Sequence, residues 1–278
     1  MLDYYCGLSV DDVILKKGTT IKNIEDIEEW LTSQVCPKLT REQIVTFLLS
    51  CNNELELVKK TIMSNYTLKF AFPNLFMERH LQDEAITNAI KVIHCCEMPE
   101  YFNECIIGVS QLVDTNYRNY NFADYIKLVL MGLESAMFNA NPPNGIIIIL
   151  DAMGFGLMHV TRLRINLLKW FMQYIQEAIT VQIKAVHIVN SNFVTEVVFN
   201  LTKPFIKNEL VKNLHFHSTS HMESFFENYI PKRYLPKDIG GDLESVAFYG
   251  QFALEKVKKM EDYFKFEEQQ RFNLNGSK

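Results

Sequence analysis

Residues 145–151 read Gly-Ile-Ile-Ile-Ile-Leu-Asp, and this run constrains the fold more than any other feature of the chain. β-Branched residues favour strands, and a strand without polar alternation must be covered on both faces. Such strands occur in parallel sheets that carry helices on both sides. Its apolar part, Ile146–Leu150, is the longest in the chain and is far too short to cross a bilayer. The run therefore predicts a central parallel strand in an α/β domain.

From about residue 100 onward, strand-like and helix-like segments alternate. Strands are expected at Cys105–Val113, Gly145–Asp151, Lys184–Asn190 and Asn213–His217. Helices are expected at Phe122–Phe138, Leu163–Ile179 and Phe193–Leu201. This alternation predicts a mostly parallel sheet with right-handed crossovers. After Gly240-Gly241, one charged helix is expected from about Glu244 to Phe266.

The first eighty residues are expected to form a bundle of three or four helices. One helix is indicated by apolar residues at helical spacing, Ile21, Ile24, Ile27 and Leu31. Thr40 with Gln43 is a capping-box pattern for the next helix, and Asn53 with Glu56 is a similar start for a helix that ends before Pro73. We therefore divide the chain into a helical domain at residues 1–80 and an α/β domain with a C-terminal helix at residues 81–278.

Charge and cysteine usage narrow the class of protein. The formal net charge of −5 argues against a nucleic-acid binder, which normally carries a basic domain. The N-terminus lacks the basic and apolar regions of a secretory signal. The cysteines are irregularly spaced and include no Cys-x-x-Cys pair, which indicates reduced thiols and predicts a cytoplasmic protein. They are Cys6, Cys36, Cys51, Cys95, Cys96 and Cys105.

The turn after the isoleucine run contains part of a nucleotide-binding glycine motif. Gly154-Phe155-Gly156 resembles the start of a Gly-x-Gly-x-x-Gly fingerprint, but His159 stands where the third glycine is needed. The sequence also contains no phosphate-binding Gly-x-x-x-x-Gly-Lys loop and no Gly-x-Ser-x-Gly elbow. Nucleotide binding and hydrolase chemistry are therefore disfavoured.

Three histidines form the pattern His-x-His-x-x-x-His at His215, His217 and His221. On a strand the first two share a face, which is compatible with zinc. No carboxylate or cysteine lies close by in the sequence to complete a metal site. We therefore expect no metal, and we expect a strand-end pair that bonds to backbone groups.

The predicted helix at Phe193–Leu201 is amphipathic. Its apolar face is expected to consist of Val194, Val197, Val198 and Leu201. Phe199 falls among the polar positions, so it either packs against a neighbour or meets a membrane. Lysines in the same region are compatible with anionic lipid head groups or with a solvated face. They are Lys184, Lys203, Lys207 and Lys212.

Several of these segments resemble the CRAL-TRIO family of lipid-binding proteins. Val186–Phe205, VHIVNSNFVTEVVFNLTKPF, resembles its I-H-x-I-N…K-P-F signature, and Leu235-Pro236…Gly240-Gly241 is similar to its L-P-x-x-x-G-G element. The strand ending in Asp151, with Gly154 and His159, is similar to its central strand and turn. The first eighty residues, closing with Pro73-Asn74-Leu75-Phe76, resemble its helical N-terminal domain. The likeness covers nearly the whole chain, and it is strongest to the branch of tocopherol and retinaldehyde carriers.

The resemblance implies a CRAL-TRIO α/β domain with a mostly parallel sheet and a helical lid, preceded by a small all-helical domain. The implied cavity lies between sheet and helices, and residues 192–206 are its mobile lid. The implied ligand-binding residues on the lid are Val194, Val197, Val198 and Leu201. The other implied ligand-binding residues are Ile126, Val129, Leu133, Ile146, Leu150, Leu157, Leu163, Phe171, Tyr174, Ile175, Ile179, Ile183 and Val186.

The resemblance also concerns membrane contact. The implied membrane or phosphoinositide contacts are Lys184, Phe199, Lys203, Lys207 and Lys212. Gln182, Val211 and Asn213 stand where that family carries positive charge, which argues against release triggered by phosphoinositides. Val129 and Leu133 stand where tocopherol carriers of the family have serines.

These observations favour a monomeric carrier that binds a hydrophobic small molecule such as a tocopherol, retinoid, carotenoid or other isoprenoid. It transfers this molecule between membranes through transient membrane contact. No catalytic residue, metal, cofactor or nucleic acid is expected. The two alternatives are a nucleotide-dependent α/β enzyme and a protein-binding adaptor whose cavity has collapsed.

Overall fold

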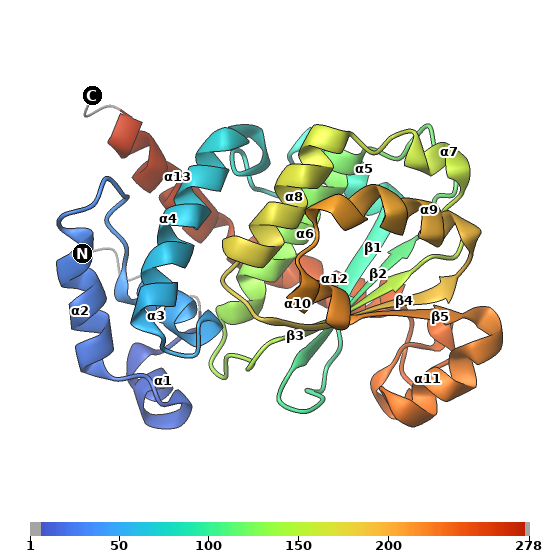
Figure 1. Ribbon diagram of the computed structural model, residues 1–278, viewed down its shortest axis with the longest axis horizontal. Helices are drawn as coiled ribbons and strands as arrows, with labels where there is room; N and C mark the ends of the chain where they lie inside the picture. Colours follow the sequence, from blue (N-terminus) through green and yellow to red (C-terminus); the bar gives the residue numbers. More distant parts are fainter. Residues whose placement is uncertain (1–6, 276–278) are drawn as a thin grey trace.

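The computed structural model describes residues 7–275 and contains a helical N-terminal part and an α/β part (Figure 1). Cys6 lies outside the described residues. The helical part contains α1 (Val10–Lys17), α2 (Ile21–Leu31), α3 (Arg41–Ser50) and α4 (Leu55–Ala71). The helix expected from the isoleucine spacing is confirmed as α2, in which Ile24 and Ile27 are buried. α4 ends before Pro73, as expected.

The starts of α3 and α4 differ. Thr40 Oγ1 accepts the N–H of Gln43 at 3.3 Å, and Gln43 Oε1 accepts the N–H of Thr40 at 2.9 Å, which confirms the capping box. The cap expected at Asn53 is wrong, because α4 begins after Glu54. Asn53 has a left-handed φ of 61°, whereas an N-cap is extended. Its Oδ1 instead accepts the hydroxyl of Thr19 at 2.7 Å.

The described residues form one five-stranded sheet in the order β1-β2-β3-β4-β5. The strands are β1 (Ile93–Glu97), β2 (Ile106–Leu112), β3 (Ile146–Asp151), β4 (Ile183–Ser191) and β5 (Leu214–Ser218). β2, β3, β4 and β5 are parallel to one another and β1 is antiparallel to β2, so the predicted mostly parallel sheet is confirmed. β1 is absent from the sequence prediction, because it follows α5 (Glu84–Val92) without any intervening turn residue.

Different helices cover the two faces of the sheet. On one face, Ile147 and Ile149 pack with Phe225 of α11 (Met222–Asn228). On the other face, Ile146 packs with Leu133 of α6 (Phe122–Met137). α8 (Ile165–Glu177) packs with α6 and α4 on this second face (Figure 1). β3 is therefore a central strand covered on both sides, as the isoleucine run predicts.

Short helical segments connect the longer elements. They are α7 (Leu157–Val160), α9 (Phe193–Thr202), α10 (Asn208–Lys212) and the 3₁₀ turns Pro73–Leu75, Lys203–Phe205, Thr219–His221, Lys232–Tyr234 and Lys237–Ile239. The last turn explains the Leu-Pro-x-x-x-Gly-Gly element. Gly240 has a φ of 91°, and a Cβ on Gly241 would lie 2.1 Å from the carbonyl oxygen of Leu235. The backbone folds back on itself so closely that only glycine fits there.

The single helix expected at 244–266 is wrong. Two helices are present, α12 (Val246–Lys259) and α13 (Glu261–Asn275). The N–H of Met260 reaches the carbonyls of both Lys256 and Val257, so the last turn tightens before the chain continues. α12 lies along β1, whereas α13 runs to the N-terminal helices (Figure 1). There Tyr263 and Phe264 share one core with residues of α2 and α3.

Buried charges connect α13 to the N-terminal part and to α6. Glu267 is fully buried, with Lys69 Nζ at 3.1 Å, Arg79 Nη2 at 2.5 Å and Arg271 Nε at 3.0 Å from its carboxylate. Lys69 and Arg79 also reach Glu134 of α6. Burial raises the pKa of Glu267, but the attraction of the three cations outweighs it and lowers the pKa to about 2. The N-terminal core thus includes a helix from the other end of the described chain, and the division at residue 80 stays a prediction.

Candidate ligand-binding site

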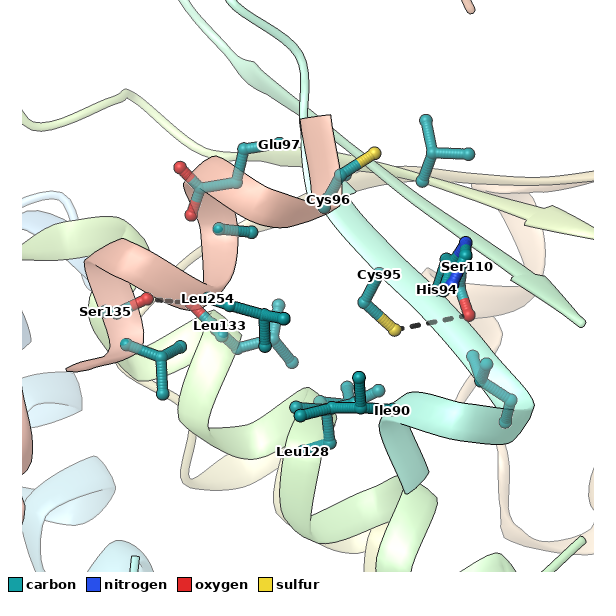
Figure 2. A pocket seen from close by; sticks show the side chains of 18 of the residues that line it. Ile90, His94, Cys95, Cys96, Glu97, Ser110, Leu128, Leu133, Ser135 and Leu254 are labelled. Carbon is teal, nitrogen blue, oxygen red and sulfur yellow. Dashed lines mark hydrogen bonds between the residues drawn. The ribbon is translucent and has the colours of Figure 1, made fainter. Parts of the chain in front are cut away.

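An apolar pocket of about 300 Å³ lies between the sheet, α6 and α12 (Figure 2). The strands contribute Cys95, Ser110, Ile146, Ile148 and Leu150. α6 contributes Tyr125, Leu128, Val129, Gly132 and Leu133. α12 contributes Ala247, Gly250, Gln251, Leu254 and Val257. The volume is that of a small-molecule site, and most of the lining is aliphatic.

One face of α6 forms the longest wall of the pocket. Tyr125, Val129 and Leu133 follow one another at intervals of four residues, which places them on the same side of the helix. Gly132 lies beside them, and a Cβ built on it would meet no atom within 4 Å. The helix therefore leaves open space in front of Gly132.

The pocket reaches solvent beside α12. Ala247 and Gln251 line the pocket, and both are exposed. Phe248 and Phe252 lie next to them on the helix, 42% and 55% exposed, with ring centroids 5.3 Å apart. Two exposed aromatic rings therefore lie on α12 beside the opening of the pocket.

The pocket has few polar side chains, and one ion pair lies among them. The thiol of Cys95 donates to Ser110 Oγ at 3.6 Å, and Ser110 Oγ donates to Tyr125 Oη at 3.4 Å (Figure 2 shows the first of these bonds). Glu97 is paired with Lys256 at 2.8 Å. Burial raises the pKa of Cys95 to about 11 and also raises the pKa of Tyr125. The thiol and the phenol are therefore both neutral at physiological pH.

A second, more polar pocket of about 410 Å³ lies where the helical part meets α8 and α10. Ser50 and Thr61 line one side, and Gln176, Glu177 and Asn213 line the other. Lys207 also lines it, and its Nζ lies 2.6 Å from Glu177.

The residues expected at the cavity lie partly in the first pocket, partly in the second pocket and partly in neither. Val129, Leu133, Ile146 and Leu150 line the first pocket. Ile175, Ile179 and Ile183 line the second. Six others line neither pocket: Ile126, Leu157, Leu163, Phe171, Tyr174 and Val186. Tyr174 is buried, with its hydroxyl accepting from Asn65 at 3.1 Å, and Leu157 is 48% exposed on α7.

Residues 192–206 form α9 and the turn after it, and none of them lines either described pocket. Val194 is buried, and Val198 and Leu201 are half-buried. Val197 is 40% exposed, so the four apolar residues do not all face inward. The ring of Phe199 packs on Phe216 of β5 with centroids 5.4 Å apart. Of the two alternatives for Phe199, packing against a neighbour is therefore the one that the structure has. The aromatic residue of α9 that points outward is Phe193, which is 62% exposed.

The four lysines expected at lipid head groups are exposed and differ in their partners. Lys184 Nζ donates to Gln182, and Lys207 is paired with Glu177. Lys203 lies in the turn after α9, and Lys212 ends α10.

The turn after β3 is built without a phosphate site. His159 Nδ1 accepts the N–H of Gly156 at 3.1 Å, so the helix that follows caps its own start. That helix, α7, has four residues. Asp151 is also occupied, because its carboxylate accepts from Gln111 at 3.0 Å and from Asn190 at 2.8 Å. These bonds join the carboxyl ends of β2, β3 and β4. Because Asp151 and the N–H of Gly156 are both bonded to protein groups, this turn gives no support to the nucleotide-dependent alternative.

The histidine pair belongs to a stack that the sequence did not indicate. His187 Nδ1 lies 3.0 Å from His217 Nε2, and the ring of His215 also stacks on His187 with ring centroids 5.0 Å apart. The expected bonding of the pair to backbone is therefore wrong for His217. His221 lies apart and contacts Ser218 at 2.7 Å. Among residues 7–275, no group of three or more metal-ligating side chains is placed to hold an ion.

Sequence reasoning missed the part of the pocket that β1 and α12 provide. Cys95, Leu254 and Val257 face it, but β1 was not expected and α12 carries its lining on a face rich in small residues. The spacing of Gly250, Leu254 and Val257 was the available signal. Within the described part of the chain, no helix has the length and apolar character needed to cross a bilayer.

Comparisons with known proteins identify relatives of this domain. Alpha-tocopherol transfer protein-like of Mus musculus is 31% identical over 124 residues, which are 44% of this chain and 36% of that protein. Clavesin-1 of Rattus norvegicus is 27% identical over 124 residues, 44% of this chain and 34% of that protein. The match thus spans about a third of the length of these relatives. The crystal structure of Sfh5 has a TM-score of 0.48 and 14% identity, covering 84% of this chain and 95% of that one.

Two family models match the chain in the order that the fold shows. The Pinta-like UBA domain matches residues 16–86, which include α2 to α4. The CRAL/TRIO domain matches residues 103–241, half of the chain, from the start of β2 to the Gly240-Gly241 turn. The resemblance seen in the sequence is thereby confirmed, and the chain belongs to the CRAL/TRIO domain family.

Proposed function

We propose that this protein is a carrier that encloses one hydrophobic small molecule in the pocket between the sheet, α6 and α12. The observation that carries the proposal is the aliphatic lining of this pocket, with Val129, Leu133 and Leu150 facing about 300 Å³ of space. Cys95, Ser110 and Tyr125 hydrogen-bond to one another, and burial keeps the thiol and the phenol neutral, so neither is an activated nucleophile or base. We propose no catalysis and no cofactor, and a monomer that acts in the cytoplasm.

The energy of enclosure is sufficient for such a role. Removing apolar ligand surface from water contributes roughly 25 cal/mol per Å². Burying about 200–300 Å² therefore contributes roughly 5–8 kcal/mol before the costs of ordering. This is enough to retain a lipid without covalent attachment. Tocopherols, retinoids, carotenoids and other isoprenoids are candidate ligands.

Exchange of the ligand requires a wall that moves, and we propose α9 with residues 192–206 for this role. Val186 and Ile188 lie in an interior strand on the α9 side of the sheet and are still only half-buried. α9 thus covers this part of the sheet loosely, with the contact of Phe199 and Phe216 as a described anchor. Its outward movement would extend the pocket toward β4.

A membrane surface is proposed around the outer side of α9. Phe193 and Val197 are exposed there, and Met158 of α7 and Ile165 of α8 are 50% and 45% exposed. Figure 1 shows α7 and α9 at the same end of the α/β part. Exposed Arg162, Arg164 and Lys169 supply positive charge near the start of α8. Apolar side chains with flanking cations suit transient contact with an anionic bilayer.

The direct test is to purify the full chain from a lipid-rich host and identify co-purifying molecules by native mass spectrometry. Gly132→Phe fills the open space in front of α6 and is expected to remove the bound molecule, whereas Gly132→Ala retains it. Thermal unfolding shows whether both variants are folded. The proposal fails if wild type carries no hydrophobic molecule and binds none from a panel of lipids.

The lid is tested separately by transfer between vesicles. Val198→Asp places an unpaired charge on the half-buried side of α9, and it is expected to abolish ligand retention. Phe193→Ser is expected to slow transfer and to leave equilibrium binding unchanged, since Phe193 is exposed. Phe199→Ser should lower ligand retention as well, because it removes the contact with Phe216. Equal transfer rates for wild type and Phe193→Ser would argue against the membrane surface.

A further inference from the structure

The pocket has a polar end and an apolar end. β2 and β3 are parallel, with Ile106 opposite Ile146 and Ser110 opposite Leu150. Leu133 packs with Ile106 and Ile146, whereas Tyr125 bonds to Ser110. Along α6 the two ends are eight residues apart, which is roughly 12 Å at 1.5 Å per residue. Toward the Leu133 end, Ser135 donates to the carbonyl of Gly132 at 2.8 Å and Glu97 is paired with Lys256 at 2.8 Å. A ligand lying along α6 thus meets Ser110 and Tyr125 as the hydroxyl pair at one end.

The polar end presents a free donor. Ser110 Oγ accepts from Cys95 and gives its own proton to Tyr125 Oη, at 3.6 and 3.4 Å. Within residues 7–275 this leaves the phenolic hydrogen of Tyr125 without an acceptor, in a side chain that lines the pocket. A buried hydroxyl without an acceptor costs free energy, so a ligand oxygen placed there gains by contacting it.

The same end is unsuited to an anion. No Lys or Arg lines this pocket in the described structure, and Glu97, its one carboxylate, is matched by Lys256. A carboxylate or phosphate brought into the pocket would lose its hydration without gaining a lysine or arginine partner. The high pKa of the Cys95 thiol and of the Tyr125 phenol keeps both groups neutral and donating.

We propose that Tyr125, oriented by Ser110 and Cys95, selects apolar ligands that end in a neutral hydroxyl or carbonyl group and excludes those that end in an anion. This inference rests on the proposed carrier function and specifies the ligand class of the same pocket. Tyr125 is then the specificity-determining residue, and the face of α6 from Val129 to Leu133 receives the apolar chain.

The test is calorimetric titration of the full chain at pH 8 with decan-1-ol and with decanoate, whose ten-carbon chains suit the length of the α6 wall. Wild type is expected to bind decan-1-ol at least tenfold more tightly than decanoate. Tyr125→Phe is expected to weaken decan-1-ol binding about tenfold. Tyr120→Phe is the matched control, because Tyr120 is a buried neighbour that does not line the pocket, and it should change the affinity less than twofold.

The outcomes separate this inference from the carrier function. If both ligands bind equally, or if Tyr125→Phe binds decan-1-ol like wild type, the selection by Tyr125 is overturned and the carrier function stands. If wild type binds neither ligand nor any other lipid tested, the carrier function falls and this inference falls with it. Thermal unfolding of each variant confirms that loss of binding is not loss of fold.

Discussion

Lys69 Nζ lies 3.1 Å from Glu267 Oε1, although the two residues are 198 positions apart in the sequence. Lys69 belongs to α4, and Glu267 belongs to α13. Arg79 and Arg271 contact the same carboxylate, and all four side chains are almost completely buried. A buried carboxylate with three cations stabilises the fold only while every partner is present, since each charge has given up its hydration.

Glu267→Gln is therefore expected to lower the free energy of unfolding by about 3–5 kcal/mol, because it leaves three buried cations with one carboxylate fewer. Chemical denaturation monitored by circular dichroism measures this change. Lys59→Met is the control, since its partner Glu56 is 89% exposed and the pair is worth less than about 1 kcal/mol. A loss at Glu267 no larger than that of the control would show that the buried cluster is not a stabilising unit.

Gly132→Ala is expected to raise the free energy of unfolding by up to about 1 kcal/mol. Gly132 lies inside α6, where glycine is less favourable than alanine, and an added Cβ meets no atom within 4 Å. The melting temperature should rise accordingly. Gly241→Ala is the contrasting variant, because its Cβ would overlap the carbonyl of Leu235, and it should be strongly destabilising. A stability loss in Gly132→Ala would mean that the space in front of α6 is filled.

His187 makes stability depend on pH. Burial, with the nearby His215 and His217, lowers the pKa of His187 to about 3 from an ordinary value of 6.5. Its stabilising contribution is complete above pH 6.5 and is lost as the pH falls toward 3, because the unfolded chain takes up the proton first. Between pH 6 and 5 the unfolding free energy should fall by about 1.4 kcal/mol per pH unit for each such group.

The measurement is denaturant unfolding of wild type and His187→Gln at several values between pH 7 and 5. The unfolding free energy of the variant should depend less steeply on pH, by the contribution of about one titrating group. Tyr229→Phe keeps an aromatic ring against His187 and leaves every histidine in place, so its slope should match that of wild type. The same slope in His187→Gln as in wild type would assign the acid sensitivity to other groups.

Asp151→Asn is expected to cost about 1–3 kcal/mol, because an amide nitrogen then faces the amide of Gln111. The double variant Asp151→Asn with Gln111→Glu restores an acceptor opposite a donor, and it should recover part of the loss. Both free energies come from urea unfolding. Additive losses in the double variant would indicate that the two side chains do not act as a pair.

The sheet was predictable because its signals are local and strong. The isoleucine run and the strands around it need only side-chain shape and alternation to be recognised, and the turn at Gly240-Gly241 needs only glycine. β1 lacked such a signal, since helix α5 passes into it at Ile93 without a break. The start of β1 at Ile93 is set by its pairing with β2, a segment further along the sequence.

The pocket was predictable only in part, for a related reason. Val129, Leu133, Ile146 and Leu150 follow from the facing of α6 and β3. Ile126 and Tyr174 have the same apolar character but are used in the contact between helices, with Tyr174 bonded to Asn65. Periodicity gives the side of a helix on which a residue lies, whereas the neighbour that covers that side comes from elsewhere in the chain, here Leu68 of α4 and Trp170 of α8.

The place of α13 has a consequence for how the protein is made. A ribosome releases the N-terminal helices early, but Tyr263, Phe264 and Glu267, which complete their core, emerge only after the whole sheet has been synthesised. Until then Lys69 and Arg79 have no carboxylate from α13, and the core of the N-terminal helices lacks Tyr263 and Phe264. Since chains ordinarily fold in the order of their synthesis, the N-terminal helices must here wait for α13 before their core is complete. Nascent chains would therefore expose that half-built core to chaperones throughout translation of the sheet.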